Sequence, residues 1–115
     1  MEPKKLPLQL EFVGRLKKSM IEWAEQKKIR LQTIEYVIPF VLTDKSLSIW
    51  LFYDTNQTKN SYEDDGTHEE VKNKCLNFLM EFNYPKDYLK EVNFFTDSDE
   101  NVKENYEGSY FFRLR

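Results

Sequence analysis

Residues 34–53, IEYVIPFVLTDKSLSIWLFY, contain the clearest structural signal in the chain. From Ile34 to Leu42 every even position is large and apolar, and β-branched and aromatic residues dominate, which predicts a strand. Leu47 to Tyr53 predicts a second strand, and the polar turn Thr43 to Ser46 between them favours an antiparallel hairpin. Pro39 cannot donate to a strand ladder, so we expect the first strand to lie at a sheet edge or to carry a bulge.

Helices are predicted on both sides of this hairpin. From Leu8 to Lys28, apolar residues recur at three- and four-residue steps, which is typical of a helix with one apolar stripe. A second long helix is predicted from Thr67 to Tyr84-Pro85, because Glu70 follows Thr67 at the spacing of a capping box and the proline ends the helix. The polar residues 54–66 between the second strand and this helix predict a loop. The stripe of the first helix consists of Val13, Leu16, Met20 and Trp23, with Phe12 and Ala24 beside them.

The last third of the chain predicts short elements. After one helical turn at 85–90, a strand is expected from Val92 to Phe95, then a brief helix capped by Asp97 or Ser98 and running to about Tyr106. Gly108 suits a left-handed helix stop, and Ser109 to Arg115 predicts a last strand.

The expected architecture is therefore a single α+β domain over residues 1–115, in the order α-β-β-α-β-α-β. We expect about four strands in a largely antiparallel sheet, with the helices mainly on one face. The length fits one domain, and 40% hydrophobic and 16% aromatic residues argue for a folded chain.

Composition also indicates the compartment. Cys75 is the one cysteine, which excludes an intramolecular disulfide and favours a reducing, cytoplasmic location. The N-terminal residues lack the continuous apolar core of a secretory signal. The apolar stretches fall far short of the roughly 20 residues that a bilayer requires, so no membrane association is expected.

Charge is distributed unevenly along the chain. Residues 1–30 carry a net +4 and residues 31–115 a net −7; within the latter, residues 54–70 carry −5 and residues 97–107 carry −4. Such acidic segments repel phosphate, so nucleic acid is not expected as a ligand. They would attract a basic protein instead.

The side chains that catalysis requires are scarce. His68 is the one histidine, and it is expected at an exposed helix start; Cys75 falls on the apolar face of a helix, where a thiol packs as a small hydrophobe. One histidine and one cysteine are too few for zinc, and no glycine-rich phosphate loop occurs. We therefore expect no catalytic residues and no cofactor. An enzyme that uses Asp64, Asp65 and Glu69 is the alternative.

Two acidic segments partly resemble calcium-binding loops. Residues 54–65 place oxygen-bearing side chains at several EF-hand positions, but Lys59 stands where the loop needs glycine. The segment from Asp97 departs from the pattern in a similar way. No metal site is expected, and both segments are interpreted as solvated loops and helix caps.

Aromatic residues occur on both faces of two predicted strands. If helices cover one sheet face, Trp50, Phe52 and Phe111 lie on the other and form the kind of apolar patch that marks an interface. A helix or loop over that face, or a homodimer, would bury them instead. A self-associating structural or regulatory domain is therefore a second class of function.

The C-terminal segment FFTDSDENVKENYEGSYFFRLR, residues 94–115, resembles the tails of small bacterial immunity proteins of polymorphic and contact-dependent toxin systems. Those tails contain a strand, an acidic turn, a short helix, a glycine and an aromatic strand. The resemblance covers about a fifth of the chain. It implies a non-enzymatic protein that neutralises a cognate toxin through stoichiometric binding.

The charge pattern is compatible with such a role, because an acidic inhibitor complements a basic toxin domain. The residues expected to contact the partner are aromatic anchors and acids from the two clusters: Trp50, Asp54, Tyr62, Glu63, Asp64, Asp65, Glu69, Asp97, Asp99 and Glu100.

Overall fold

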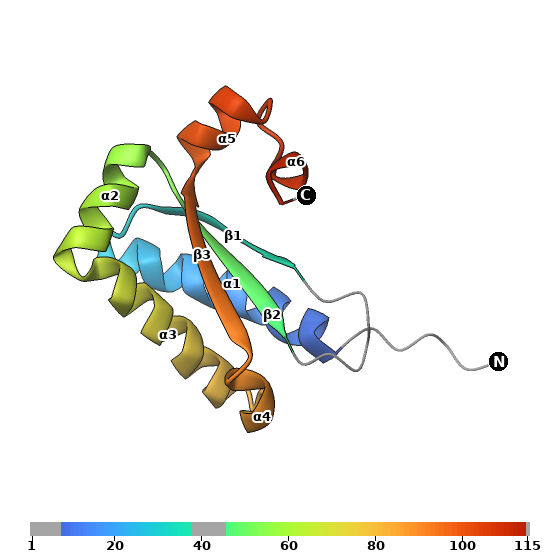
Figure 1. Cartoon of the computed structure of the whole chain (residues 1–115). Helices are drawn as coiled ribbons and strands as arrows, with labels where there is room; N and C mark the ends of the chain where they lie inside the picture. The colour runs from blue at the N-terminus through green and yellow to red at the C-terminus, as the bar shows by residue number, and fades with distance from the viewer. Residues whose placement is uncertain (1–7, 38–45, 115) are drawn as a thin grey trace.

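The computed structural model of the chain describes residues 8–37 and 46–114 (Figure 1). The elements run in the order α1 (Leu8–Lys27), β1 (Leu31–Val37), β2 (Leu47–Tyr53), α2 (Asn56–Asp65), α3 (Thr67–Glu81), α4 (Lys86–Leu89), β3 (Val92–Ser98), α5 (Asp99–Asn105) and α6 (Tyr110–Arg113). The expectation of an α+β fold is confirmed. The predicted residues 38–42 of the first strand, Pro39 and the turn residues 43–45 lie outside the described residues.

The sheet in the described residues has three strands in the order β1-β2-β3. β1 and β2 pair antiparallel, as predicted, with an irregularity between Leu31 and Thr33. β2 and β3 pair in parallel over their full length. The prediction of a four-stranded, largely antiparallel sheet is therefore wrong. The segment from α2 to α4 carries the chain back across a helical layer, so β3 enters the sheet in the same direction as β2.

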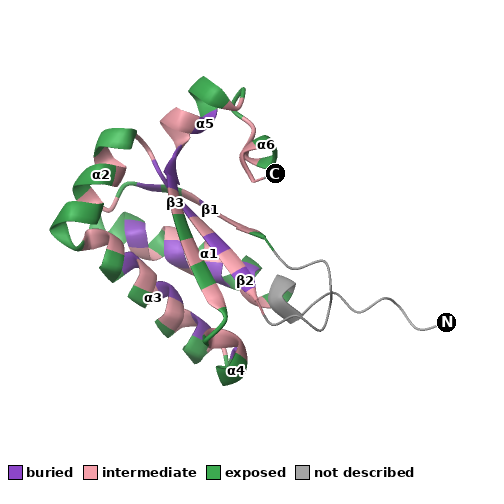
Figure 2. Cartoon of the chain, in the orientation of Figure 1, coloured by how far each residue is buried: buried purple, intermediate pink, exposed green. Residues whose placement is uncertain are grey.

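One face of this sheet packs against α1 and α3. The apolar stripe of α1 lies against the alternate residues of β2 that point to the same side, as the two periodicities predicted. Figure 2 shows the buried positions of α1 and α3 on the sides that meet the sheet. The fully buried residues of this layer include Leu16, Met20, Ile34, Leu47, Ile49, Leu51, Tyr53, Val71, Cys75 and Leu79.

Residues 56–65 form a helix where the sequence predicted a loop. Thr55 is the N-cap of α2, and its hydroxyl accepts a hydrogen bond from the Thr58 amide at 3.1 Å. Gly66 ends α2 in the left-handed conformation, with φ of 88°. Tyr62, the one large apolar side chain of the segment, packs its ring edge-on against Tyr53. One apolar residue in ten gives no hydrophobic periodicity, so the sequence does not predict this helix.

The predicted capping box at the start of α3 is also wrong. The helix begins at Thr67 as expected, but Gly66 stands at the N-cap and gives no side-chain cap. The Thr67 amide instead donates to the Asp65 carboxylate at 2.9 Å. Because α3 follows α2 directly, the N-cap of α3 is Gly66 and not Thr67.

The predicted C-terminal strand is a helical turn. Glu107 and Gly108 both adopt positive φ, 55° and 74°, and turn the chain back over the sheet. The Ser109 side chain then caps α6. Tyr110 packs on Phe52 from the sheet face opposite α1 and α3, with ring centroids 4.7 Å apart. The last residues therefore cover this face instead of extending the sheet.

The short elements before this turn agree with the sequence. α4 supplies the helical turn expected at 85–90, and α5 begins after Ser98, whose hydroxyl accepts from the Asn101 amide. β3 is longer than predicted and continues to Ser98. No helix among the described residues is both long and apolar enough to span a membrane.

Candidate functional site

The two acidic segments meet at one end of the sheet. Because β2 and β3 are parallel, their carboxyl ends lie side by side, and each strand leads directly into a helix start. α2 begins after Thr55 and α5 begins after Ser98. Figure 1 shows α2 and α5 at the same end of the molecule.

Hydrogen bonds join these two helix starts. The Asn56 amide donates to Glu100 Oε1 at 2.9 Å, and the Glu100 amide donates to the Asp54 carbonyl at 3.1 Å. The Ser98 hydroxyl also bonds to Asn56 Oδ1. Residues more than 40 positions apart are thereby fixed beside each other, so the two acidic segments meet at these helix starts.

We define the acidic surface as the solvent-accessible carboxylates of this end: Glu63, Asp64, Asp65, Glu69, Glu70, Glu100, Glu104 and Glu107. All of them are exposed except Glu100, which is half-buried. α2 contains no buried residue, and it is drawn in the exposed and intermediate colours throughout in Figure 2. Ten helical residues extend about 15 Å, so the surface spans a length comparable to a protein contact.

Several acids of this surface make local contacts. Glu63 accepts from the Thr96 hydroxyl at 3.0 Å and lies 3.6 Å from the Lys59 ammonium. Glu69 pairs with Lys72 at 3.4 Å. Hydrogen bonds from the Thr67 hydroxyl and amide hold the pKa of Asp65 below its ordinary value. These contacts are exposed, so they restrain the carboxylates without removing them from solvent.

Three of the ten sequence-predicted contact residues serve the fold. Asp54 accepts from Arg30 Nε at 2.5 Å, and although burial acts to raise its pKa, hydrogen bonds from Thr58, the Thr55 amide and Arg30 lower it. Asp97 is buried beneath Arg113. Asp99 accepts from Lys103 and from the Tyr110 hydroxyl, and both contacts lower its pKa.

Tyr62 is also committed to packing. Its hydroxyl accepts from the Arg30 amide at 3.0 Å, which ties α2 to the turn after α1. With its ring against Tyr53, the side chain is half-buried.

Trp50 lies on the sheet face opposite α1 and α3. Its ring stacks on Phe95 with centroids 4.8 Å apart, and the Arg113 guanidinium lies 4.5 Å above it. Phe52, on the same face, is fully buried under Tyr110, so the expected exposed patch of Trp50, Phe52 and Phe111 does not form as such.

The exposed apolar residues of this face are a different set. Phe95 is 44% exposed, and Val37, Phe111 and Phe112 are also exposed. The sequence reasoning missed Phe95, although the alternation from Val92 to Thr96 places it on the same side as Asn93 and Asp97.

The candidate catalytic side chains are packed into the structure. His68 Nδ1 lies 3.0 Å from the Tyr53 hydroxyl, and burial together with nearby Lys72 lowers its pKa. Burial raises the pKa of the Cys75 thiol to about 12. Neither arrangement activates a nucleophile at neutral pH. Within residues 8–37 and 46–114, no group of three or more metal-ligating side chains is found.

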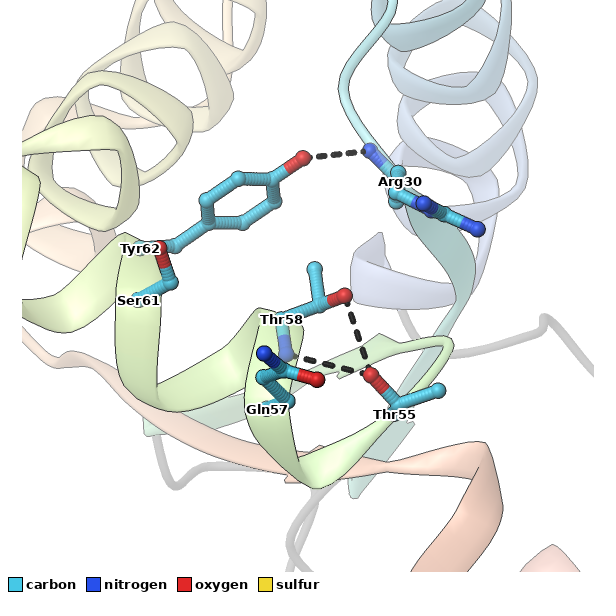
Figure 3. Close-up of a pocket in the computed structure, with 6 residues that line it drawn as sticks. All are labelled: Arg30, Thr55, Gln57, Thr58, Ser61 and Tyr62. Carbon is cyan, nitrogen blue, oxygen red and sulfur yellow. Dashed lines mark hydrogen bonds between the residues drawn. The ribbon is translucent and has the colours of Figure 1, made fainter.

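A polar hollow of about 440 Å³ lies between α2 and the turn that follows α1 (Figure 3). The residues that line it include no histidine, cysteine or carboxylate: Arg30, Thr55, Gln57, Thr58, Ser61 and Tyr62. The Thr55 and Thr58 hydroxyls bond to each other, and Tyr62 is held by the Arg30 amide. The lining supplies no acid–base pair.

Another hollow, of about 600 Å³, borders the acidic surface. Glu69 and Glu70 line it with Lys27 and Lys74, between α1 and α3. Asp64 and Asp65 do not line it. The three carboxylates of the alternative enzyme therefore do not converge on this hollow.

Comparison of the chain with protein-family models, with curated proteins and with solved structures found no match.

Proposed function

We propose that this chain is a non-enzymatic protein-binding domain that recognises a basic protein partner through the acidic surface. The observation that carries the proposal is the junction of α2 and α5 at the ends of the parallel strands. It brings together two acidic segments, of net charge −5 and −4, whose accessible carboxylates form the acidic surface.

Electrostatics gives this surface a physical role. A concentration of like charge on one end of a molecule steers an oppositely charged protein toward it and raises the association rate. The same charge repels nucleic acid. A helical surface with few internal ion pairs also keeps its carboxylates available to a partner's lysines and arginines.

The ionisable side chains in and near the core are engaged within the fold, which supports a binding function over an enzymatic one. His68 is engaged with Tyr53, Cys75 is buried, and Asp97 is paired with Arg113. Each of these groups contributes to folding in its present position.

We further propose that the partner is a toxin domain and that the chain is an immunity protein. Support comes from the resemblance of residues 94–115 to the tails of such proteins and from the acidic surface, which complements a basic toxin. An unpaired, buried thiol at Cys75 is compatible with action in a reducing compartment such as the cytoplasm.

The test uses the protein encoded by the gene next to this one. Expressed alone it should arrest growth, and co-expression of this chain should restore growth. Purified together, the two proteins should form a stable complex whose association rate falls with salt.

Reversing the charge of carboxylates on the acidic surface tests whether the partner binds there. Asp64 and Glu104 are exposed, and the side chain of neither makes a hydrogen bond or ion pair with the described residues. We expect Asp64→Lys with Glu104→Lys to weaken the complex by about tenfold or more. Glu22→Lys with Glu25→Lys on α1 makes the same change in net charge at exposed positions and should have less than about a threefold effect. A neighbour that does not bind, or equal effects of the two pairs, would contradict the proposal.

A further inference from the structure

The outer side of β3 is an open sheet edge. β3 is the last strand in the order β1-β2-β3, and all seven of its residues pair with β2. Figure 1 looks onto this edge, and β3 is drawn in front with no described element covering it. The other backbone–backbone hydrogen bonds of the described residues do not involve Val92–Ser98. Alternate N–H and C=O groups on this side are therefore available to another strand.

The first five residues of this edge lack the devices that usually prevent pairing, and the charged Asp97 lies near the end of the strand, paired with Arg113. Residues 92–96, VNFFT, contain no charge, no proline and no glycine. The register with β2 is continuous, so no bulge twists the strand away. At the opposite edge, β1 carries an irregular register near Thr33 and the charged Glu35, which pairs with Lys17. Charged residues and bulges of that kind are among the features that protect an exposed edge.

Apolar surface accompanies the free backbone. Phe95 is 44% exposed and continues the aromatic stack that begins at Trp50. A strand added beside β3 would cover this ring, because neighbouring strands lie about 4.8 Å apart. The edge thus offers both backbone hydrogen bonds and an aromatic contact.

We infer that two copies of this chain associate through β3, antiparallel and related by a two-fold axis. Such an interface is isologous, so the same patch must complement itself. The VNFFT segment meets this condition because it is neutral, whereas the chain as a whole carries −3 and its acidic surface would repel a second copy. The product is one six-stranded sheet.

The charges at the two ends of the edge are compatible with this arrangement. Lys90 and Glu91 precede β3, and the Lys59–Glu63 ion pair lies beside its far end, where Glu63 bonds to Thr96. Antiparallel pairing sets the start of each strand against the end of the other. The Lys90 and Glu91 side chains of one copy then face the Lys59–Glu63 pair of the other. Each pair has one positive and one negative charge, so there is no net repulsion between them.

Light scattering and sedimentation of the full chain test the inference. We expect a species of twice the 14.0 kDa chain mass at high micromolar concentration and dissociation on dilution. Phe95→Lys places a charge on the edge and should weaken the dimer by about tenfold or more. Phe111→Lys makes the same chemical change on α6, at a position 63% exposed, and should leave the dimer intact.

Hydrogen exchange on the unaltered chain supplies a second measurement. Amides within Val92–Thr96 should gain protection as concentration rises, while amides of α6 should not. A monomer at every concentration would overturn the inference, as would a dimer that survives Phe95→Lys but is lost in Phe111→Lys. The acidic surface is unaltered in both variants, so this result is independent of the proposed function.

Discussion

Arg113, in the last turn of the chain, donates through Nε to the carboxylate of Asp97 at the end of β3. Asp97 is 6% exposed, and the guanidinium lies between the rings of Trp50 and Tyr106, 4.5 and 5.3 Å from their centroids. The contact holds α6 against the sheet face that α1 and α3 leave open.

Removing this cation leaves a buried carboxylate without its charged partner. We expect Arg113→Ala to lower the free energy of unfolding by about 2–3 kcal/mol, less than for a fully buried pair because Arg113 is partly accessible. Urea denaturation measures the change. Lys18→Ala, at an exposed position on α1, is the control and should alter stability by less than about 0.5 kcal/mol. Equal stabilities of the two variants would show that the pair does not anchor α6.

Acidification should weaken the fold through His68. Burial and Lys72 lower its pKa in the folded state, so the unfolded chain takes up the proton first. The contribution is fully present above the unfolded pKa of about 6.5 and is lost as pH falls through the folded pKa. Protonation also makes both ring nitrogens donors, so that Nδ1 can no longer accept a hydrogen bond from the Tyr53 hydroxyl, which lies 3.0 Å away.

The slope of this loss cannot exceed about 1.4 kcal/mol per pH unit for one proton. Unfolding free energies measured from about pH 8 to about pH 5 should decline in the unaltered chain and stay nearly flat in His68→Gln. The comparison is clean because the chain has one histidine. Parallel pH profiles for the two proteins would refute this assignment.

Helix capping distinguishes Thr55 from Thr67. Thr55 accepts from the Thr58 amide, so Thr55→Ala should cost about 1 kcal/mol. Thr67 lies inside α3 after Gly66, and Thr67→Ala should cost less than about 0.5 kcal/mol. Thermal unfolding of both variants gives the comparison. A larger loss at Thr67 would restore the capping box that the sequence suggested.

Cys75 should be inert while the chain is folded. It is fully buried, and its pKa of about 12 leaves almost no thiolate at neutral pH. A chromogenic disulfide reagent should therefore react at the rate of unfolding in buffer and at once in concentrated urea. Rapid reaction in buffer would show that α3 opens locally.

The sequence predicted those elements whose period reflects a buried face. The alternation from Leu47 to Tyr53 and the stripe from Val13 to Ala24 each arise because one side of the element lies in the core. Both elements were placed within a residue of their actual bounds.

Elements that depend on distant contacts were not predictable in this way. α2 is held by Tyr62 against Tyr53, and α6 by Tyr110 against Phe52. The alternation of Tyr110, Phe112 and Leu114 is typical of a strand, but the positive φ at Glu107 turns these residues over the sheet before they can extend it. The parallel direction of β3 likewise depends on the whole intervening helical segment.

The candidate site, too, is predictable from the sequence only in part. Its acids are visible in the composition of residues 54–70 and 97–107, but the hydrogen bond between Asn56 and Glu100 that unites them joins residues 44 apart. The burial of Asp97 depends on Arg113, which only the folded chain brings to it.

The parallel pairing of β2 with β3 has a consequence for how the chain is made. Each residue of β3 pairs with one 45 positions earlier, whereas β1 and β2 are near neighbours in sequence. During synthesis the hairpin of β1 and β2 can form while the ribosome is still producing α3. β2 cannot pair with β3 until β3 has been synthesised. Throughout that interval the segment IWLFY has one unpaired side, and this is when the nascent chain is most prone to aggregate.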